Sequence, residues 1–191
     1  VVIAGAFGSY INVGSAIAYG ADETTARLEA VVRDVFEHPS ARVFPVTSGT
    51  AANALALTAL CPPWGAVLCH ESAHILNSEC GATSLLGGGA IMRGVPGGDF
   101  RISPDSSQAA LDWVRWDDPH HSQPRVLSLT QPTDMGTIYS VDDVAALAAI
   151  AHGRGLRIHV DGARVANAIA ALGCSPADLT WRAGVDALSL G

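Results

Sequence analysis

The chain has 191 residues, of which 49% are hydrophobic and 15% are charged. This length and composition favour one globular domain and exclude a disordered or fibrous chain. Eighteen acidic against eleven basic residues give a net charge of −7, which argues against a nucleic-acid-binding protein.

The sequence offers no sign of a membrane partner or of export. No apolar run reaches the length of a membrane span, and the opening "VVIAGAFGSYINVG" lacks the basic region of a secretory signal. The cysteines form no C-x-x-C pair and lie among apolar neighbours: Cys61, Cys69, Cys80 and Cys174. We therefore expect free, buried thiols in a reducing compartment and a cytoplasmic protein.

Short apolar runs alternate with helical patterns along the chain. The first pattern, 23–38, predicts an amphipathic helix that ends at Pro39 and whose shared face holds Leu28, Val31, Val32, Val35 and Phe36. Strands are then predicted at 42–47, 66–70, 90–95, 125–131, 156–161 and 185–191, and further helices after 48–50, within 102–116, over 140–155 and from about 164 to 173. Such alternation is typical of parallel strands joined by crossover helices, so we expect a three-layer α/β/α fold with a mostly parallel sheet.

Two helix starts carry specific capping signals. Ser140 and Asp143 form a capping-box pattern at the start of the 140–155 helix. In "SPADLTW", Ser175 at an N-cap and Pro176 at the first helical position predict one more short helix.

In an open parallel sheet, ligands bind outside the carboxyl ends of the strands. At one such end Ser48, Gly49 and Thr50 lead into a helix. A helix N-terminus presents unpaired N–H groups and a positive dipole, which suit a phosphate. The alternative is that Ser48 or Thr50 only caps the helix.

A second strand end carries Asp161. A carboxylate at the end of a buried strand is costly unless a group pairs with it. Arg164, three residues on, could form a structural ion pair with it. The functional alternative is a ligand cation, such as the protonated ring nitrogen of pyridoxal phosphate.

The stretch "HESAH", His70 to His74, formally matches the zinc motif H-E-x-x-H. That motif needs a helix, whereas "AVLC" before it reads as a strand, so we expect no metal. We interpret His74 instead as a single functional histidine in a loop after a strand.

Several segments together resemble the low-specificity L-threonine aldolases, and most closely their phenylserine aldolase-like branch. These segments are "FPVTSGTAANALAL", "CHESAHILNSECGA", "LSLTQPTDMGTIYS", "IHVDGARVANAIAALG" and "GVDALSLG". The resemblance implies the aspartate-aminotransferase-like fold with pyridoxal 5'-phosphate, and cleavage of a β-hydroxy-α-amino acid to glycine and an aldehyde. It covers 19–191 as the cofactor-binding large domain, while 1–18 matches poorly.

The resemblance implies a role for each matching residue. Ser48, Gly49 and Thr50 would bind the cofactor phosphate, and His74 would stack on its ring and take a substrate proton. Asp161 would pair with the ring nitrogen, and Arg164 would bind the substrate carboxylate or the ring-hydroxyl side of the cofactor. Thr130 and Gln131 would face the same site. The resemblance also implies a homodimer or homotetramer whose site lies at the subunit interface.

One expected residue is missing, because the printed chain contains no lysine. In the family, the lysine that anchors the cofactor follows the segment corresponding to "VDALSLG" within a few residues. Three explanations are open. The printed sequence can stop at a covalently modified lysine, the chain can be a fragment without the smaller C-terminal domain, or the protein can be a non-catalytic cofactor-binding relative. A β-eliminating lyase or an aminotransferase of the same fold is the alternative enzyme.

Overall fold

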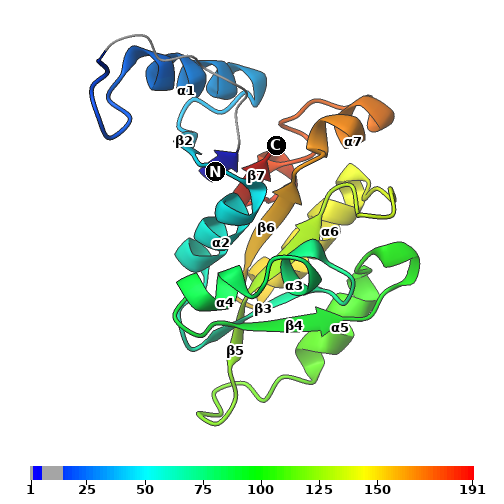
Figure 1. Cartoon of the computed structure of the whole chain (residues 1–191). Helices are drawn as coiled ribbons and strands as arrows, with labels where there is room; N and C mark the ends of the chain where they lie inside the picture. Colours follow the sequence, from blue (N-terminus) through cyan, green and yellow to red (C-terminus); the bar gives the residue numbers. More distant parts are fainter. Residues whose placement is uncertain (1, 6–14) are drawn as a thin grey trace.

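The computed structural model describes residues 2–5 and 15–191, and Figure 1 shows the order of its elements. The strands are β1 Val2–Gly5, β2 Arg42–Pro45, β3 Gly65–His70, β4 Ile91–Val95, β5 Gln123–Thr130, β6 Arg157–Gly162 and β7 Ala187–Leu190. The helices are α1 Glu23–Val35, α2 Gly49–Leu60, α3 His74–Asn77, α4 Ala82–Leu86, α5 Pro104–Asp112, α6 Val141–Gly153 and α7 Val165–Leu172. Short 3₁₀ turns lie at η1 Gly98–Phe100 and η2 Trp181–Ala183.

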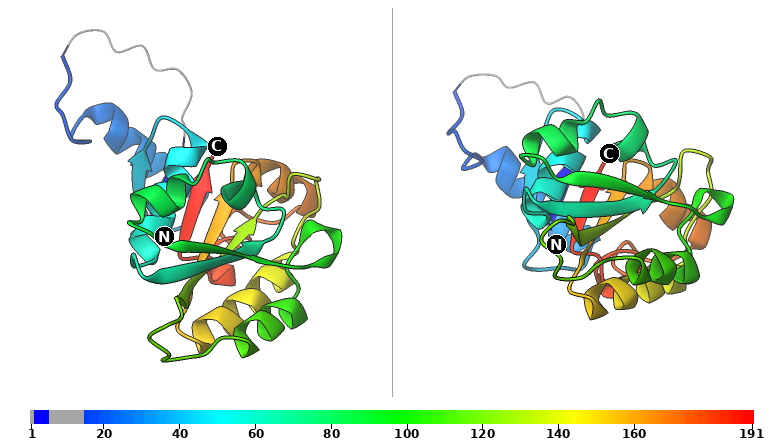
Figure 2. Two further views of the ribbon diagram at one scale, coloured as in Figure 1. Left: turned by 60° about the horizontal axis from the view of Figure 1, so that its bottom comes forward. Right: turned by 90° about the horizontal axis from the view of Figure 1, so that it is seen from below.

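The strands form one sheet in the order β2-β1-β7-β6-β5-β3-β4. Every pairing in this sheet is parallel. Helices α2 and α4 cover one face, and α5 and α6 cover the other (Figure 2). The predicted three-layer α/β fold is therefore confirmed.

Side chains alternate between the two faces along the central strands, as a pleated strand requires. On β6, Ile158 and Val160 join the core beneath α5 and α6, so His159 and Asp161 point to the α2 face. The largest core cluster lies on the α5–α6 face and includes Leu127, Leu147 and Leu188. A second cluster around Leu57 and Val67 packs below α2.

The capping prediction for the 140–155 helix is confirmed. Ser140 Oγ accepts the Asp143 N–H at 3.1 Å, and the Asp143 carboxylate accepts the Ser140 N–H at 3.0 Å. Helix α5 begins in the same way, with Ser103 as its cap. These reciprocal bonds satisfy N–H groups that have no partner inside the helix.

The predicted helix over "SPADLTW" is wrong. Ser175 does accept the Asp178 N–H at 3.1 Å, as an N-cap would. Beyond it, Thr180 Oγ1 donates to the Pro176 carbonyl at 2.6 Å, and the chain turns into η2. The local signal for a helix start was correct, but the segment closes into turns before a helix can propagate.

The predicted apolar face of α1 is only partly buried. Val32 and Phe36 are 4% exposed, whereas Val31 is 58% and Val35 is 47% exposed. The row at positions 28, 32 and 36 therefore faces the core, and the neighbouring row at 31 and 35 does not. The main contact of α1 with the sheet is with the edge strand β2, and there only the row at 28, 32 and 36 is covered.

The cysteine prediction holds in part. All four cysteines are free, and Cys61 and Cys69 are buried. Cys174 is half-buried and Cys80 is exposed, because Cys80 lies in the turn between α3 and α4. Among the described residues, no helix combines the length and apolar character needed to cross a bilayer.

Candidate active site

Asp161 lies where the central strands end. Thr130, the last residue of β5, is its partner in the β5–β6 register. The Asp161 side chain is directed toward α2, and the residue is only 4% exposed. The end of β6 thus places an acidic group under the first turns of a helix.

The hydrogen bonds of Asp161 come from uncharged groups. Asn53, one turn inside α2, donates from Nδ2 to Asp161 Oδ2 at 3.1 Å, and the Ala163 N–H donates to Oδ1 at 3.3 Å. Burial raises the pKa of the Asp161 carboxyl, although these hydrogen bonds act to lower it. Because an ionised carboxylate is favoured by a nearby cation, this site is suited to a ligand with a positive charge.

Arg164 does not form the structural ion pair with Asp161 that the sequence left open. Its guanidinium binds the carboxylate of Asp134 instead. Among residues 2–5 and 15–191, no arginine forms an ion pair with Asp161. The positive charge of Arg164 acts on Asp161 only from a distance, where it lowers the pKa of the carboxyl. The guanidinium and the Asp134 carboxylate are both partly exposed, so Arg164 remains accessible from solvent.

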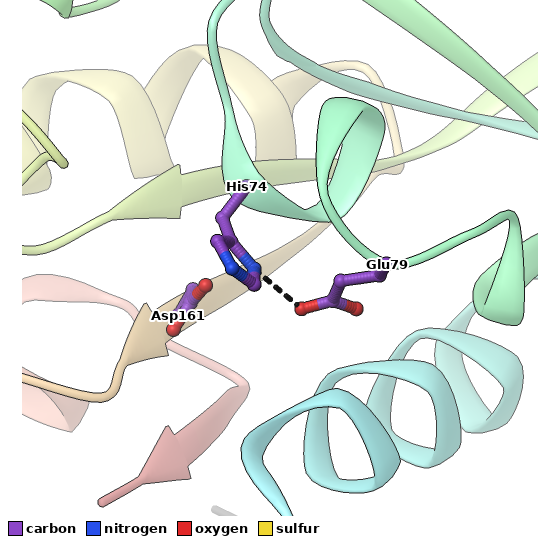
Figure 3. A group of neighbouring side chains, drawn as sticks. All are labelled: His74, Glu79 and Asp161. Carbon is purple, nitrogen blue, oxygen red and sulfur yellow. Dashed lines mark hydrogen bonds and ion pairs between the residues drawn. The ribbon is translucent and has the colours of Figure 1, made fainter.

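His74 lies near Asp161 on a third element (Figure 3). The prediction of a loop position is wrong, because His74 begins the single-turn helix α3. Its Nδ1 lies 3.0 Å from Oε1 of Glu79, and its side chain is 40% exposed. The buried Glu79 carboxylate therefore holds the Nδ1 edge of the ring, while part of the ring stays accessible to solvent.

Glu79 and Asn53 complete a buried polar cluster with His74 and Asp161. Asn53 Nδ2 donates to Glu79 Oε1 at 2.8 Å as well as to Asp161. The described structure contains no hydrogen-bond partner for two buried atoms of the cluster, Asn53 Oδ1 and Glu79 Oε2. Unpaired buried polar atoms are rare in folded proteins, and two of the eight in the described structure belong to this cluster.

The zinc motif does not form. His70 is the last residue of β3, so His70 and His74 do not share a helix face. His74, Glu79 and Asp161 do bring ligand-type atoms within 4.8 Å of one another. However, the Asn53 amino group donates to both carboxylates. It thus places hydrogens where a cation would need free lone pairs.

The predicted phosphate site lies at the start of α2. Ser48 caps the helix by accepting the Ala51 N–H at 3.2 Å. Ser48 and Gly49 are exposed, and a Cβ placed on Gly49 would meet no atom within 4 Å. The helix N-terminus therefore offers open N–H groups and a positive dipole in addition to its cap.

Gln131 is buried beside Asp161, and both ends of its side-chain amide form hydrogen bonds with Tyr139. Its Nε2 donates to the Tyr139 carbonyl at 2.7 Å, and its Oε1 accepts the Tyr139 N–H at 3.0 Å. These bonds join the end of β5 to the segment before α6. A contact between Gln131 and a cofactor stays a prediction.

A family model described as beta-eliminating lyase matches residues 6–191. The chain belongs to the beta-eliminating lyase family. It is 42% identical over 180 residues to a low specificity L-threonine aldolase of Pseudomonas aeruginosa, a match that covers 94% of this chain and 51% of the relative. It is 32% identical to the corresponding Saccharomyces cerevisiae enzyme, over 85% of this chain and 41% of the relative.

The solved structures agree with this assignment. The Leishmania major threonine aldolase superposes with a TM-score of 0.81 at 26% identity, covering 88% of this chain and 48% of that one. The resemblance to low-specificity L-threonine aldolases and the fold predicted from the sequence are thereby confirmed, whereas the phenylserine aldolase-like branch stays a prediction. The chain spans about half the length of the curated relatives named "Low specificity L-threonine aldolase" from Pseudomonas. A boundary between 1–18 and 19–191 stays a prediction, and residues 6–14 within it lie outside the described residues.

Members of the beta-eliminating lyase family use pyridoxal phosphate, and the site fits that group. The buried Asp161 carboxylate lies beside α2 and suits a protonated ring nitrogen. The open first turn of the same helix suits a phosphate. The partly exposed ring of His74 lies close to Asp161 and could cover an aromatic ring there.

Asn53 and Glu79 are the two site residues to which the sequence analysis assigned no function. Asn53 was visible as a polar residue inside the apolar helix "AANALAL", and Glu79 as an acidic residue close to His74. Either signal alone is common on solvated surfaces. Only the fold shows that both side chains are buried and meet Asp161.

Proposed function

We propose that the protein containing this chain is a pyridoxal-phosphate-dependent aldolase, a carbon–carbon lyase that cleaves β-hydroxy-α-amino acids to glycine and an aldehyde. The observation that carries the proposal is the buried Asp161 carboxylate beside the open N-terminus of α2. The names of the Pseudomonas and yeast relatives support the substrate class. L-Threonine, allo-threonine and phenylserine are the substrates to test.

Pyridoxal phosphate, when bound, supplies an electron sink that stabilises negative charge at the α-carbon of an amino acid. In this chain, Ser48, Gly49 and Thr50 would bind its phosphate through hydroxyl and N–H groups. Asp161 would hold the proton on its ring nitrogen. Because the Asp161 carboxylate is buried, its attraction to that N–H is weakly screened.

His74 and Arg164 would act on the substrate. The open edge of the His74 ring would accept the β-hydroxyl proton, directly or through a water, while Glu79 holds its Nδ1. Arg164 would bind the substrate carboxylate after exchanging its ion pair with Asp134. That exchange is inexpensive, since partly exposed ion pairs contribute only about 0–1 kcal/mol.

The partners and the compartment belong to the same proposal. We propose a homodimer or homotetramer in the cytoplasm, with each site lying at a subunit interface. Tyr19, whose side chain is fully exposed, is available to a second subunit in such an assembly. The two free and buried thiols, Cys61 and Cys69, are consistent with a reducing compartment.

The test is a product assay on the natural full-length protein with pyridoxal phosphate. Release of glycine and an aldehyde from L-threonine or phenylserine supports aldol cleavage. Release of pyruvate and ammonia from serine would instead favour β-elimination, the activity that the family description names. A lysine encoded within a few residues after Gly191 is expected, and its absence would favour a non-catalytic cofactor-binding relative.

A further inference from the structure

Glu79 is a buried acidic residue to which the proposed reaction assigns no step. Its side chain is 0% exposed although it lies in the short connection between α3 and α4. One oxygen, Oε1, accepts from Asn53 Nδ2 at 2.8 Å and lies 3.0 Å from His74 Nδ1. Burying a carboxylate is unfavourable, so a role for this residue has to come from these contacts.

The contact with Glu79 determines which tautomer His74 adopts. A carboxylate only accepts hydrogen bonds, so the His74 nitrogen that faces it must carry a hydrogen. When the ring is neutral, Nδ1 is therefore the nitrogen that carries the hydrogen, and Nε2 keeps its lone pair. A proton acceptor is then available on the ring edge that Glu79 does not occupy.

The contact with Asn53 determines how the amide is turned. Asn53 Nδ2 lies between Glu79 Oε1 and Asp161 Oδ2, at 2.8 and 3.1 Å. With the amide reversed, its carbonyl oxygen would face two carboxylates without any hydrogen between them. Glu79 therefore keeps the amino group directed at Asp161, even though Asn53 Oδ1 is left without a partner in the described structure.

We propose that Glu79 is a positioning residue that orients both ends of the site, holding His74 with its Nε2 unprotonated and turning the Asn53 amino group toward Asp161. This inference rests on the proposed function for the reaction that His74 serves. The orientation of the two side chains does not depend on that reaction. It can therefore be measured without substrate.

The test compares Glu79→Met and Glu79→Gln with the wild-type full-length protein. Met has a similar length and no acceptor, whereas Gln retains one carbonyl oxygen. The first readout is the ¹⁵N NMR shift of the His74 ring in cofactor-free protein, assigned by comparison with His74→Gln. We expect a protonated Nδ1 in the wild type, the same tautomer in Glu79→Gln, and its loss in Glu79→Met.

The second readout is the rate of glycine release. Groups that orient metal-binding histidines contribute about 10- to 100-fold. By analogy, we expect a loss of this order in kcat for Glu79→Met and partial rescue in Glu79→Gln. The matched control is Glu71→Gln, an exposed glutamate before α3, which should leave both readouts unchanged.

Three results would overturn the inference. They are a wild-type His74 with an unprotonated Nδ1, an unchanged tautomer in Glu79→Met, or an unchanged kcat in that variant. The first applies even when Glu79→Met does not fold. A wild-type protein without aldolase activity would contradict the proposed function and leave the tautomer result standing.

Discussion

Two buried polar clusters lie on the α2 face of β6. We call the one nearer the start of the strand the lower cluster and the one at its carboxyl end the upper cluster. The lower one is centred on His159, whose ring nitrogens lie 2.8 Å from Ser128 Oγ and 3.1 Å from Ser189 Oγ. The upper one is centred on Asp161 and contains Asn53, Glu79 and His74. Apart from the His74 ring, which is 40% exposed, the side chains of both clusters are buried, yet their hydrogen bonding differs.

The lower cluster is uncharged and complete. Burial lowers the pKa of His159 to about 3, so the ring is neutral, and both of its nitrogens have partners. The upper cluster holds two carboxylates and leaves Asn53 Oδ1 and Glu79 Oε2 unpaired in the described structure. A completed neutral network serves the fold, whereas a charged and incomplete network is what a cofactor site requires.

The largest expected effect is that of Asp161→Asn in the upper cluster. We expect kcat to fall on the order of 10²–10³-fold, as it does when a single preorganised electrostatic partner is lost. Steady-state assays of glycine release from L-threonine measure this. A loss of less than tenfold would contradict the role of Asp161 at the ring nitrogen.

The same variant should not destabilise the cofactor-free protein. Burial raises the pKa of Asp161 above its unfolded value, so the folded state binds more protons between the two values. Stability is therefore lost as the pH rises through that window, and at neutral pH the ionised group is unfavourable to folding. Thermal unfolding at pH 7 should give an equal or higher Tm for Asp161→Asn, and a lower Tm would indicate a structural role.

His159→Leu should give the opposite pattern in the lower cluster. Leaving the Ser128 and Ser189 hydroxyls unpaired should lower the free energy of unfolding by about 1–3 kcal/mol. The kcat of the folded enzyme should stay within about twofold, because the charged cluster above is untouched. Urea unfolding and kinetics on the same sample would check this, and a loss of kcat without a loss of stability would reverse our assignment of the two clusters.

The His159 pKa also predicts a pH dependence. Its folded value of about 3 lies below the unfolded value, so between about 3 and 6.5 the unfolded state binds the extra proton. Wild-type stability should therefore fall with decreasing pH in that range, by up to about 1.4 kcal/mol per pH unit from this residue. In His159→Leu this contribution should disappear, which unfolding curves at pH 4, 5 and 6 would reveal.

Gly49→Asp should separate cofactor binding from stability at the start of α2. A Cβ added at Gly49 meets no atom within 4 Å, and a carboxylate at a helix N-terminus stabilises the helix by about 0.3–1 kcal/mol. Repulsion of a phosphate costs about 1 kcal/mol for each pair of charges 4 Å apart even in water. We expect an equal or higher Tm and at least roughly tenfold weaker binding of pyridoxal phosphate by fluorescence titration. Unchanged affinity would place the phosphate elsewhere.

Asp134→Asn should give the smallest effect. It removes the partly exposed ion pair with Arg164, so stability should change by no more than about 1 kcal/mol. Because Arg164 then no longer exchanges partners, KM for the amino acid should fall by up to about fivefold with kcat unchanged. A raised KM would show that Asp134 holds Arg164 in its working orientation.

The sequence was sufficient for those features that depend on neighbouring residues. The strand that carries Asp161 near its end follows from periodicity, and the capping box at Ser140 follows from contacts three residues apart. Of the cluster around Asp161, the sequence indicated Asp161 and His74 but not Asn53 and Glu79. Asn53 is separated from Glu79 by 26 residues and from Asp161 by 108, and nothing in the local pattern reports that they meet.

One wrong prediction and one alternative that the structure excludes have the same origin. The N-cap at Ser175 is real, but the bonds of Thr180 and the approach to η2 end the helix at once. The partner of Arg164 is Asp134, on the segment after β5, rather than Asp161, three residues before it in the sequence. In both cases tertiary packing overrides a local signal.

The central claim is that the carboxyl edge between α2 and β6 is a pyridoxal phosphate site. The most direct measurement is a crystal structure of the natural full-length protein with pyridoxal phosphate. We predict the ring nitrogen within hydrogen-bonding distance of Asp161, the phosphate at Ser48–Thr50 and the His74 ring against the pyridine. A cofactor bound away from Asp161, or one whose ring nitrogen faces solvent, would contradict the account.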